Sequence, residues 1–342
     1  MSYIMMVLGW VLRFFGDVCD NYGIAIILFT IFIKLVLLPL TVKQQSSMLK
    51  TQKIQPLLNE LQQKYGNDKE KLNQETMKLY QRYNINPMGG CLPMLIQFPI
   101  LIMLYWVVRK PVIYIMGFGG DEVWRIVSAM LEYCNGSEEN LNAFLSSYGI
   151  ESIAKLTDNA YKSFGNFEIQ IARILSDHPD IMNSQWILET GKHYSIIQFN
   201  FLGLDLSQTP NLGALFGLCT GKTEGLDLKT VYLWIIPVLS GVSAYVTSKV
   251  SQMQSPQPQN TNGDDKGGAM GSMKTMMVIM PLMSVWFAFT LPAGIGLYWI
   301  ISNILSLVQQ VVLNKVLNPG ITEEEIEGEI VSAKKSRKKR KK

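Results

Sequence analysis

Residues 22–42, with the sequence YGIAIILFTIFIKLVLLPLTV, form an apolar stretch that is long enough to cross a bilayer as one helix. The only charge in this stretch is Lys34. A Lys near the middle of a membrane helix costs about 2.5–3.5 kcal/mol on insertion scales, so we expect it only where it faces water, a partner or a functional cavity. The alternative is that its long side chain carries the ammonium to the nearer membrane surface.

The small and polar residues of this stretch share one side of the predicted helix. Gly23, Thr30, Lys34 and Thr41 are separated by seven, four and seven positions, which places them on one stripe at 3.6 residues per turn. Such stripes are commonly helix-packing contacts worth about 0.6 kcal/mol each. However, no predicted span contains an acidic residue that could neutralise Lys34. The sequence therefore favours a wet, positively charged cavity among the spans.

Composition and hydropathy predict an all-α membrane protein. Hydrophobic residues make up 48% of the 342 residues and charged residues 17%, against about 25% charged residues in a soluble domain. Four further stretches carry no charge and have the length of a membrane helix: 88–108, 230–248, 275–293 and 294–313. Together with residues 22–42, they predict five transmembrane helices.

Lys and Arg near the span ends predict the orientation, because positive segments resist translocation. The loop 43–86 carries eight of them, and the segment after Leu313 carries nine. We therefore expect both in the cytoplasm and the N-terminus outside. The long segment 109–229 is then extracytoplasmic, where its 14 acidic residues outnumber its 9 basic residues.

These boundaries divide the chain into ten segments. They are an extracytoplasmic amphipathic arm (1–21), the first span (22–42), a cytoplasmic helical hairpin (43–86), the second span (87–108), an extracytoplasmic region with a helical insert (109–229), the third span (230–250), a cytoplasmic linker (251–273), the fourth span (274–293), the fifth span (294–314) and a cytoplasmic basic tail (315–342).

The sequence patterns of the loop 43–86 and of the outer region 109–229 both predict helices. In 43–86, two apolar stripes flank a turn at 66–68, and this hairpin is either a docking element or only a spacer. The sequence of the outer region predicts short helices near 121–134, 138–147, 150–163, 167–177 and 180–190. Cys134 and Cys219 fall in this region and could pair, although their spacing does not establish a disulfide.

Nothing in the sequence points to a cofactor or a metal. The glycines of 217–223, GLCTGKT, enclose three residues where a phosphate-binding loop has four. His178 and His193 are the only histidines, and neither belongs to a metal-ligand pattern with cysteines.

Several motifs in this order resemble the YidC/Oxa/Alb family of membrane protein insertases. They are the basic residue in the first span followed by 37–40 (LLPL), 74–77 (QETM) before Tyr83, 86–93 (NPMGGCLP), 96–99 (IQFP), 291–294 (LPAG), 296–299 (GLYW) and 302–303 (SN). The resemblance covers residues 20–116 and 194–314. The insert 117–193 departs from the short loop of the family, and the resemblance says nothing about its role.

The resemblance implies five transmembrane helices around a hydrophilic groove that is open to the cytoplasm and to lipid. It places Lys34 where the family usually carries Arg, with Thr30, Gln97, Ser302 and Asn303 hydrating the groove and Tyr298 and Trp299 lining it. Lys keeps the positive charge of Arg but lacks its planar fork of donors.

The implied activity is nucleotide-independent insertion and folding of membrane proteins in a bacterial plasma membrane. The expected partners are nascent membrane-protein substrates and the Sec translocon, with no DNA, no enzymatic reaction and no cofactor. A channel or secondary transporter is the alternative, but five unlike spans show no related halves. A third reading is a receptor that acts through its outer domain.

The basic tail has its own expected partners. Eight of its last nine residues are cationic: Lys334, Lys335, Arg337, Lys338, Lys339, Arg340, Lys341 and Lys342. Such a segment cannot build a core, so we expect it to be disordered and free to contact an anionic surface, which is ribosomal RNA, anionic lipid or the acidic run at 323–329. The resemblance to insertases, which receive nascent chains, favours the ribosome.

Overall fold

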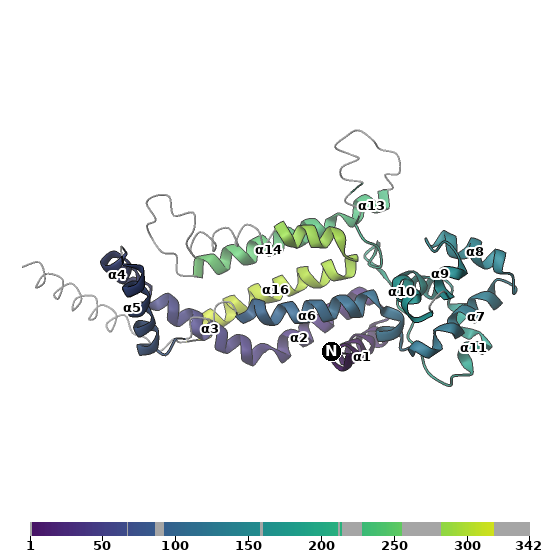
Figure 1. Cartoon of the computed structure of the whole chain (residues 1–342), viewed down its shortest axis with the longest axis horizontal. Coiled ribbons are helices and arrows are strands. Elements are labelled where there is room, and N and C mark those ends of the chain that lie inside the picture. The colour runs from purple at the N-terminus through teal and green to yellow at the C-terminus, as the bar shows by residue number, and fades with distance from the viewer. Residues whose placement is uncertain are drawn as a thin grey trace, which may run out of the picture. The chain divides into compact units, whose positions relative to one another are not determined.

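The computed structural model describes residues 2–66, 68–85, 92–157, 160–210, 213, 228–254 and 282–317. Figure 1 shows that these residues are mostly helical, as the sequence predicts. The predictions on the linker after residue 254, on Cys219 and on the basic tail lie outside the described residues. The chain divides into two compact units, residues 1–32, 99–241 and 283–301 in the first and 33–98, 242–282 and 302–342 in the second.

The elements follow one another in a simple order. They are α1 (Ser2–Cys19), α2 (Tyr22–Val36), α3 (Leu38–Lys53), α4 (Gln55–Tyr65), α5 (Lys69–Arg82), α6 (Leu92–Arg109), the π-helix η2 (Val112–Met116), the 3₁₀-helix η3 (Gly120–Glu122), α7 (Val123–Tyr133), α8 (Glu138–Ser147), α9 (Ile153–Thr157), α10 (Ala160–Asp177), the 3₁₀-helix η4 (Pro179–Asn183), α11 (Gln185–Leu188), β1 (Asn200–Phe201), β2 (Leu204–Asp205), α13 (Leu228–Leu233), α14 (Ile235–Gln254) and α16 (Ala293–Val316).

Helices long and apolar enough to cross a membrane lie where spans are predicted. Two single helices, Val231–Ser251 and Ala293–Val316, are each long and apolar enough. The bent pair of α2 and α3 makes a third if it is one span. In the region of the second predicted span, Pro99–Arg109 is a shorter apolar helix. In the region of the fourth, the described residues 282–290 are helical.

The first predicted span is interrupted at Leu37. The axes of α2 and α3 differ by 61°, and α3 begins with a proline in its first turn. Pro39 has no N–H, and its ring clashes with the carbonyl four residues earlier, so a continuous helix cannot pass through it without bending. The stripe expected on one helix is therefore divided, because Thr41 lies on α3 while Gly23, Thr30 and Lys34 lie on α2.

In the segment 43–86, where the sequence predicts a helical hairpin, α4 and α5 form a pair with its own apolar core. Its core consists of Ile54, Leu57, Leu79 and Ile85, against which Leu58, Leu61, Tyr80 and Tyr83 pack. Asp68 begins α5, and its side chain accepts a hydrogen bond from the N–H of Lys71 at 3.0 Å. Because α4 and α5 bury their apolar sides on each other, the Lys and Glu side chains remain on the outside.

The outer insert differs from the prediction mainly in where its helices end. Helices α7 and α8 lie where they are expected, but α9 has only five residues and α10 runs through 160–177 as one helix. Cys134 is buried at the end of α7. Cys219 lies outside the described residues, so the structure does not test whether the two cysteines pair.

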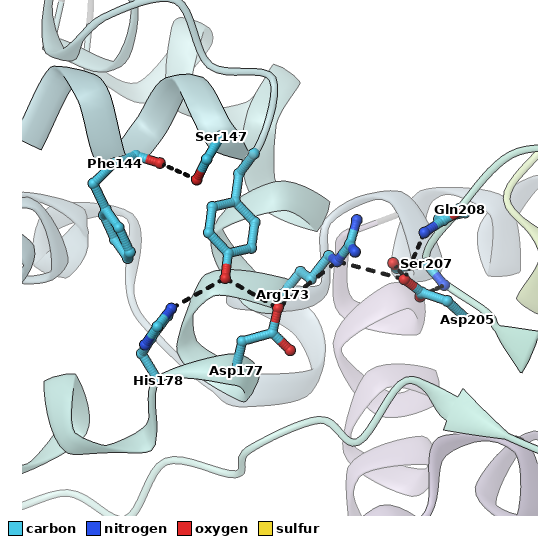
Figure 2. A network of polar contacts seen from close by, with 9 residues as sticks. Phe144, Ser147, Arg173, Asp177, His178, Asp205, Ser207 and Gln208 are labelled. Carbon is cyan, nitrogen blue, oxygen red and sulfur yellow. Dashed lines mark hydrogen bonds and ion pairs between the residues drawn. The ribbon is translucent and has the colours of Figure 1, made fainter. Parts of the chain in front are cut away.

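A chain of polar contacts crosses the insert, and Figure 2 shows it around His178, Asp177, Arg173 and Asp205. The hydroxyl of Tyr148 donates to Asp177 at 3.1 Å and lies 3.1 Å from Nε2 of His178. The tyrosine hydroxyl therefore links the imidazole of His178 to the carboxylate of Asp177. Arg173 then lies 3.9 Å from Asp177 and 3.4 Å from Asp205.

Asp205 belongs to a small β-hairpin that the sequence did not predict. Strands β1 and β2 are antiparallel, and the two residues between them, Leu202 and Gly203, both have positive φ. This is the backbone of a two-residue turn that follows the right-handed twist of the strands.

The hairpin and its flanks cap two span helices. The carbonyl of Gln198 accepts the N–H of Tyr22 at 3.1 Å, at the start of α2. The carbonyls of Leu206 and Gln208 accept the N–H groups of Gly294 and Ala293 at 3.0 and 2.8 Å, at the start of α16. The first N–H groups of a helix have no partner within the helix, so this segment satisfies donors that would otherwise be unpaired.

Glu168 is a fully buried acid on α10. One carboxylate oxygen accepts the N–H of Ile113 at the start of η2, at 3.2 Å, and the other has no hydrogen-bond partner within the described part of the chain. Burial raises the pKa of the Glu168 carboxyl to about 7, against the lowering effects of the Ile113 and Val112 amides and of Lys110. The folded state therefore favours the protonated form.

Glu168→Gln is expected to stabilise the folded protein at high pH. Because the pKa rises from 4.5 to about 7 on folding, ionisation costs stability as pH rises through this window, by on the order of 3 kcal/mol in full. The glutamine variant cannot ionise, so its thermal midpoint should exceed that of the wild type at about pH 8 and match it at about pH 4, below both pKa values.

The matched control is Glu139→Gln, which neutralises an exposed acid in the same insert. The difference between the thermal midpoints at the two pH values should be the same in this variant as in the wild type. If Glu168→Gln also retains the full pH dependence of the wild type, ionisation of Glu168 is not its cause.

Candidate functional site

Lys34 lies on α2 and contacts the last span. Its ammonium donates a hydrogen bond to the Oγ of Ser306, on α16, at 2.7 Å. Among the residues that the structure describes, the ion pairs involve other cations, and no carboxylate lies within 4.0 Å of Lys34. Within the described part of the chain, the charge is therefore hydrogen-bonded but not neutralised.

The same part of α16 makes two further hydrogen bonds beside Lys34. The hydroxyl of Ser306 donates to the carbonyl of Ser302 at 2.8 Å, one turn earlier. The side-chain amide of Gln309 donates to the carbonyl of Lys34 at 3.4 Å. These contacts hold α2 and α16 together with polar groups at the level of the charge.

Asn303 connects α16 to α14. Its amide donates to the hydroxyl of Ser243 at 3.1 Å, and its carbonyl accepts from the hydroxyl of Thr247 at 3.3 Å. Thr247 also bonds the carbonyl of Ser243 at 2.9 Å. Asn303 is thus part of a helix-packing contact, whatever it does for a groove.

Polar pairing along α16 continues toward its C-terminal end. The amide of Gln45, on α3, donates to the side-chain oxygen of Asn314. Gln45 is buried, so this pair satisfies a polar group that would be costly without a partner.

Three predicted groove residues lie in the other compact unit. Thr30 is buried, and its hydroxyl donates to the carbonyl of Ile26 at 2.6 Å within α2. Tyr298 is buried as well, and the ring of Trp299 lies 6.0 Å from that of Phe287. A role in hydrating or lining a groove stays a prediction for these residues.

Two other predictions lie outside what the structure describes. Gln97 falls within α6, but its side chain is not among the described ones. The cationic residues 334–342 also lie beyond the described ranges.

Sequence reasoning missed the partners of Lys34. In the fifth span, Ser302, Ser306 and Gln309 follow one another at spacings of four and three, which is a polar stripe at helical periodicity, but periodicity alone does not say which helix it faces. The polar residues of this stripe and Lys34 all need polar neighbours, because each lies within an apolar helix. This shared need is the signal from which the contact could have been predicted.

The site is suited to attracting an anion. An ammonium has three N–H bonds, and one of them is used by Ser306. In the described ranges, no group of three or more His, Cys, Asp or Glu side chains could hold a metal ion. A fixed positive charge among hydroxyls and amides provides electrostatic attraction and hydrogen bonds for a polar segment.

Comparison with known proteins gives the family. A family model described as 60Kd inner membrane protein matches residues 14–320. A relative from Caldanaerobacter subterraneus subsp. tengcongensis, named "Membrane protein insertase YidC", is 30% identical over 310 residues, which are 91% of this chain and 93% of the relative.

Two other relatives carry the same name. One from Fusobacterium nucleatum subsp. nucleatum is 50% identical over 117 residues, which are 33% of this chain and 57% of the relative. One from Haemophilus influenzae is 25% identical over 308 residues, which are 90% of this chain and 36% of the relative. The chain thus spans about a third of the length of the Haemophilus protein. Because the family model covers most of the chain, the chain belongs to the 60Kd inner membrane protein family.

Proposed function

We propose that this chain is a membrane protein insertase whose working charge is Lys34. The observation that carries this proposal is an ammonium inside an apolar helix that is hydrogen-bonded to Ser306 without being neutralised. The relatives named membrane protein insertase support the activity. Such a charge attracts an acidic group in the short outer segment of a substrate and lowers the barrier that lipid imposes on that segment.

Insertion needs no nucleotide in this mechanism. Transfer of about 20 apolar residues of a substrate into lipid is itself strongly favourable. The protein has to lower only the cost of moving the polar outer segment. Thr30, Gln97, Ser302 and Asn303 would hydrate the path, Tyr298 and Trp299 would line it, and the substrate span would leave sideways into the lipid.

The proposed arrangement has five spans around a groove that is open to the cytoplasm, in a bacterial plasma membrane. The hairpin of α4 and α5 and the basic tail face the cytoplasm, and the insert lies outside, because the positive charge is concentrated in 43–86 and 334–342. The Sec translocon, the ribosome and anionic lipid are the proposed partners, and the protein acts alone on small substrates.

A secondary transporter would require corresponding broken helices in two related halves of the chain. Among the described residues, α2 with α3 is the one bent pair that qualifies as a span. This favours the insertase.

Lys34→Arg should preserve insertion, whereas Lys34→Ala should weaken it. Arg keeps the positive charge, and alanine removes the attraction for an acidic outer segment. Insertion of one substrate into proteoliposomes is compared with and without its outer Asp or Glu. The loss in Lys34→Ala should be several-fold for the acidic substrate and small for the neutral one. Normal insertion of both substrates by Lys34→Ala would show that the charge has no electrostatic role.

The orientation is tested by two single cysteines in a background without Cys19, Cys91, Cys134 and Cys219. One replaces Asn59 in the hairpin and the other replaces Asn142 in the insert. An impermeant thiol reagent on intact cells should label position 142 only. Labelling at position 59 would place the hairpin outside and contradict the proposed topology.

Removal of residues 333–342 should reduce ribosome binding several-fold at low salt. Contacts of Lys and Arg with RNA phosphates release counterions, so they weaken steeply as salt rises. Cosedimentation of the detergent-solubilised protein with vacant ribosomes is measured at two salt concentrations. If the truncated and full chains bind equally at both, the tail serves lipid binding or orientation instead.

A further inference from the structure

The hydroxyl oxygen of Ser306 accepts a hydrogen bond from the ammonium of Lys34 and donates none to it. A hydroxyl has one proton, and that of Ser306 goes to the carbonyl of Ser302 at 2.8 Å. An ammonium has no acceptor capacity, so the 2.7 Å contact can only be donated by Lys34. The serine is therefore locked by its own helix with its lone pairs toward the charge.

The backbone beside the charge is fixed to the same helix. Gln309 lies three residues after Ser306 and donates to the carbonyl of Lys34 at 3.4 Å. Lys34 is thus held at two points by α16, once at its backbone and once at its ammonium. A hydrogen bond from a charged donor is stronger than one between neutral groups, so the contact with Ser306 dominates the position of the ammonium.

A lysine needs such a contact more than an arginine does. The guanidinium is a rigid planar fork, whereas the ammonium ends a flexible four-carbon stem that would otherwise sample many rotamers. A side chain that is already held in its binding conformation loses less freedom when a ligand arrives. Because Ser306 is neutral, it holds the ammonium without cancelling its charge.

We propose that Ser306 is a positioning residue for Lys34, and that it fixes the ammonium so that its two remaining N–H bonds can meet a substrate carboxylate. This inference rests on the proposed function and deepens it, because it names the residue that makes Lys effective at this position. It also makes a specific claim, namely that the importance of Ser306 depends on which cation occupies position 34.

A purely structural role for Ser306 makes a different claim. Serine hydroxyls in membrane helices often bond the carbonyl four residues earlier and pack against neighbouring helices. If Ser306 only packs, its replacement should affect every substrate equally and should not depend on position 34.

The test is a double-mutant cycle on the full chain in proteoliposomes. Ser306→Ala and Ser306→Thr are made with Lys34 present and again together with Lys34→Arg. The substrates are one membrane protein with an Asp in its outer segment and the same protein with Asn there. Ser240→Ala is the matched control, because Ser240 on α14 is buried and its hydroxyl lies 3.3 Å from that of Ser284. Thermal midpoints of all variants report folding.

With Lys34 present, Ser306→Ala should slow insertion of the acidic substrate by about five-fold and leave the neutral substrate within about two-fold. Ser306→Thr should restore the rate because it keeps the hydroxyl. Together with Lys34→Arg, Ser306→Ala should cost less than about two-fold. Ser240→Ala should not distinguish the two substrates.

The proposal is overturned if Ser306→Ala slows both substrates equally, or costs as much with Arg as with Lys at position 34. It also fails if Ser306→Ala has no effect while Lys34→Ala weakens insertion of the acidic substrate, an outcome that leaves the proposed function intact. If Lys34→Ala itself has no effect, the electrostatic role of Lys34 fails and the positioning role fails with it.

Discussion

A lysine ammonium inside an apolar helix, with no carboxylate partner among the described residues, is the constraint that explains the polar contacts between α2 and α16. Lys34 is the single charge of α2, and an isolated charge in a low-dielectric surrounding is costly unless hydrogen bonds or water compensate for it. A carboxylate partner would compensate best, but it would cancel the field of the lysine. The hydroxyl of Ser306 stabilises the position and leaves the net charge. A neutral partner leaves the positive charge able to attract an anionic group of a ligand.

The first turns of α2 and α16 follow a second physical requirement. The first N–H groups of α2 and α16 need acceptors, and carbonyls on either side of the β-hairpin supply them. Close packing supports this cap, because a Cβ at Gly23 would lie only 2.2 Å from the ring of Phe201. Asp205 in the hairpin lies 3.4 Å from Arg173 in α10, so the insert also contacts the segment that caps the span helices.

The sequence predicted those parts of the structure whose signal is local or periodic. Apolar stretches placed the helices of the spans, and the stripe through Ile54 and Leu57 placed the hairpin of α4 and α5. The bend at Leu37 was missed although Pro39 was visible, because prolines are often tolerated in spans. The turn at Leu202 was missed because two-residue strands give no alternating pattern. The contact of Lys34 with Ser306 joins residues 272 positions apart, and no local pattern can specify it.

Entry of an apolar substrate segment into lipid lowers the free energy, so it needs no energy source. The polar end of the substrate, however, needs a path on which its polar groups keep hydrogen-bond partners. A positive charge acts over a longer distance than a hydrogen bond, and it is screened less in a low-dielectric surrounding than in water. In the proposed mechanism the charge recruits the polar end, and hydroxyl and amide groups would satisfy it at short range. Ser306 and Gln309 on α16 hydrogen-bond to Lys34, and Asn303 on the same helix pairs with α14. The two hydrogen bonds that join α2 to α16 thus also fix the position of the charge, so a change in this packing is expected to change the proposed function as well.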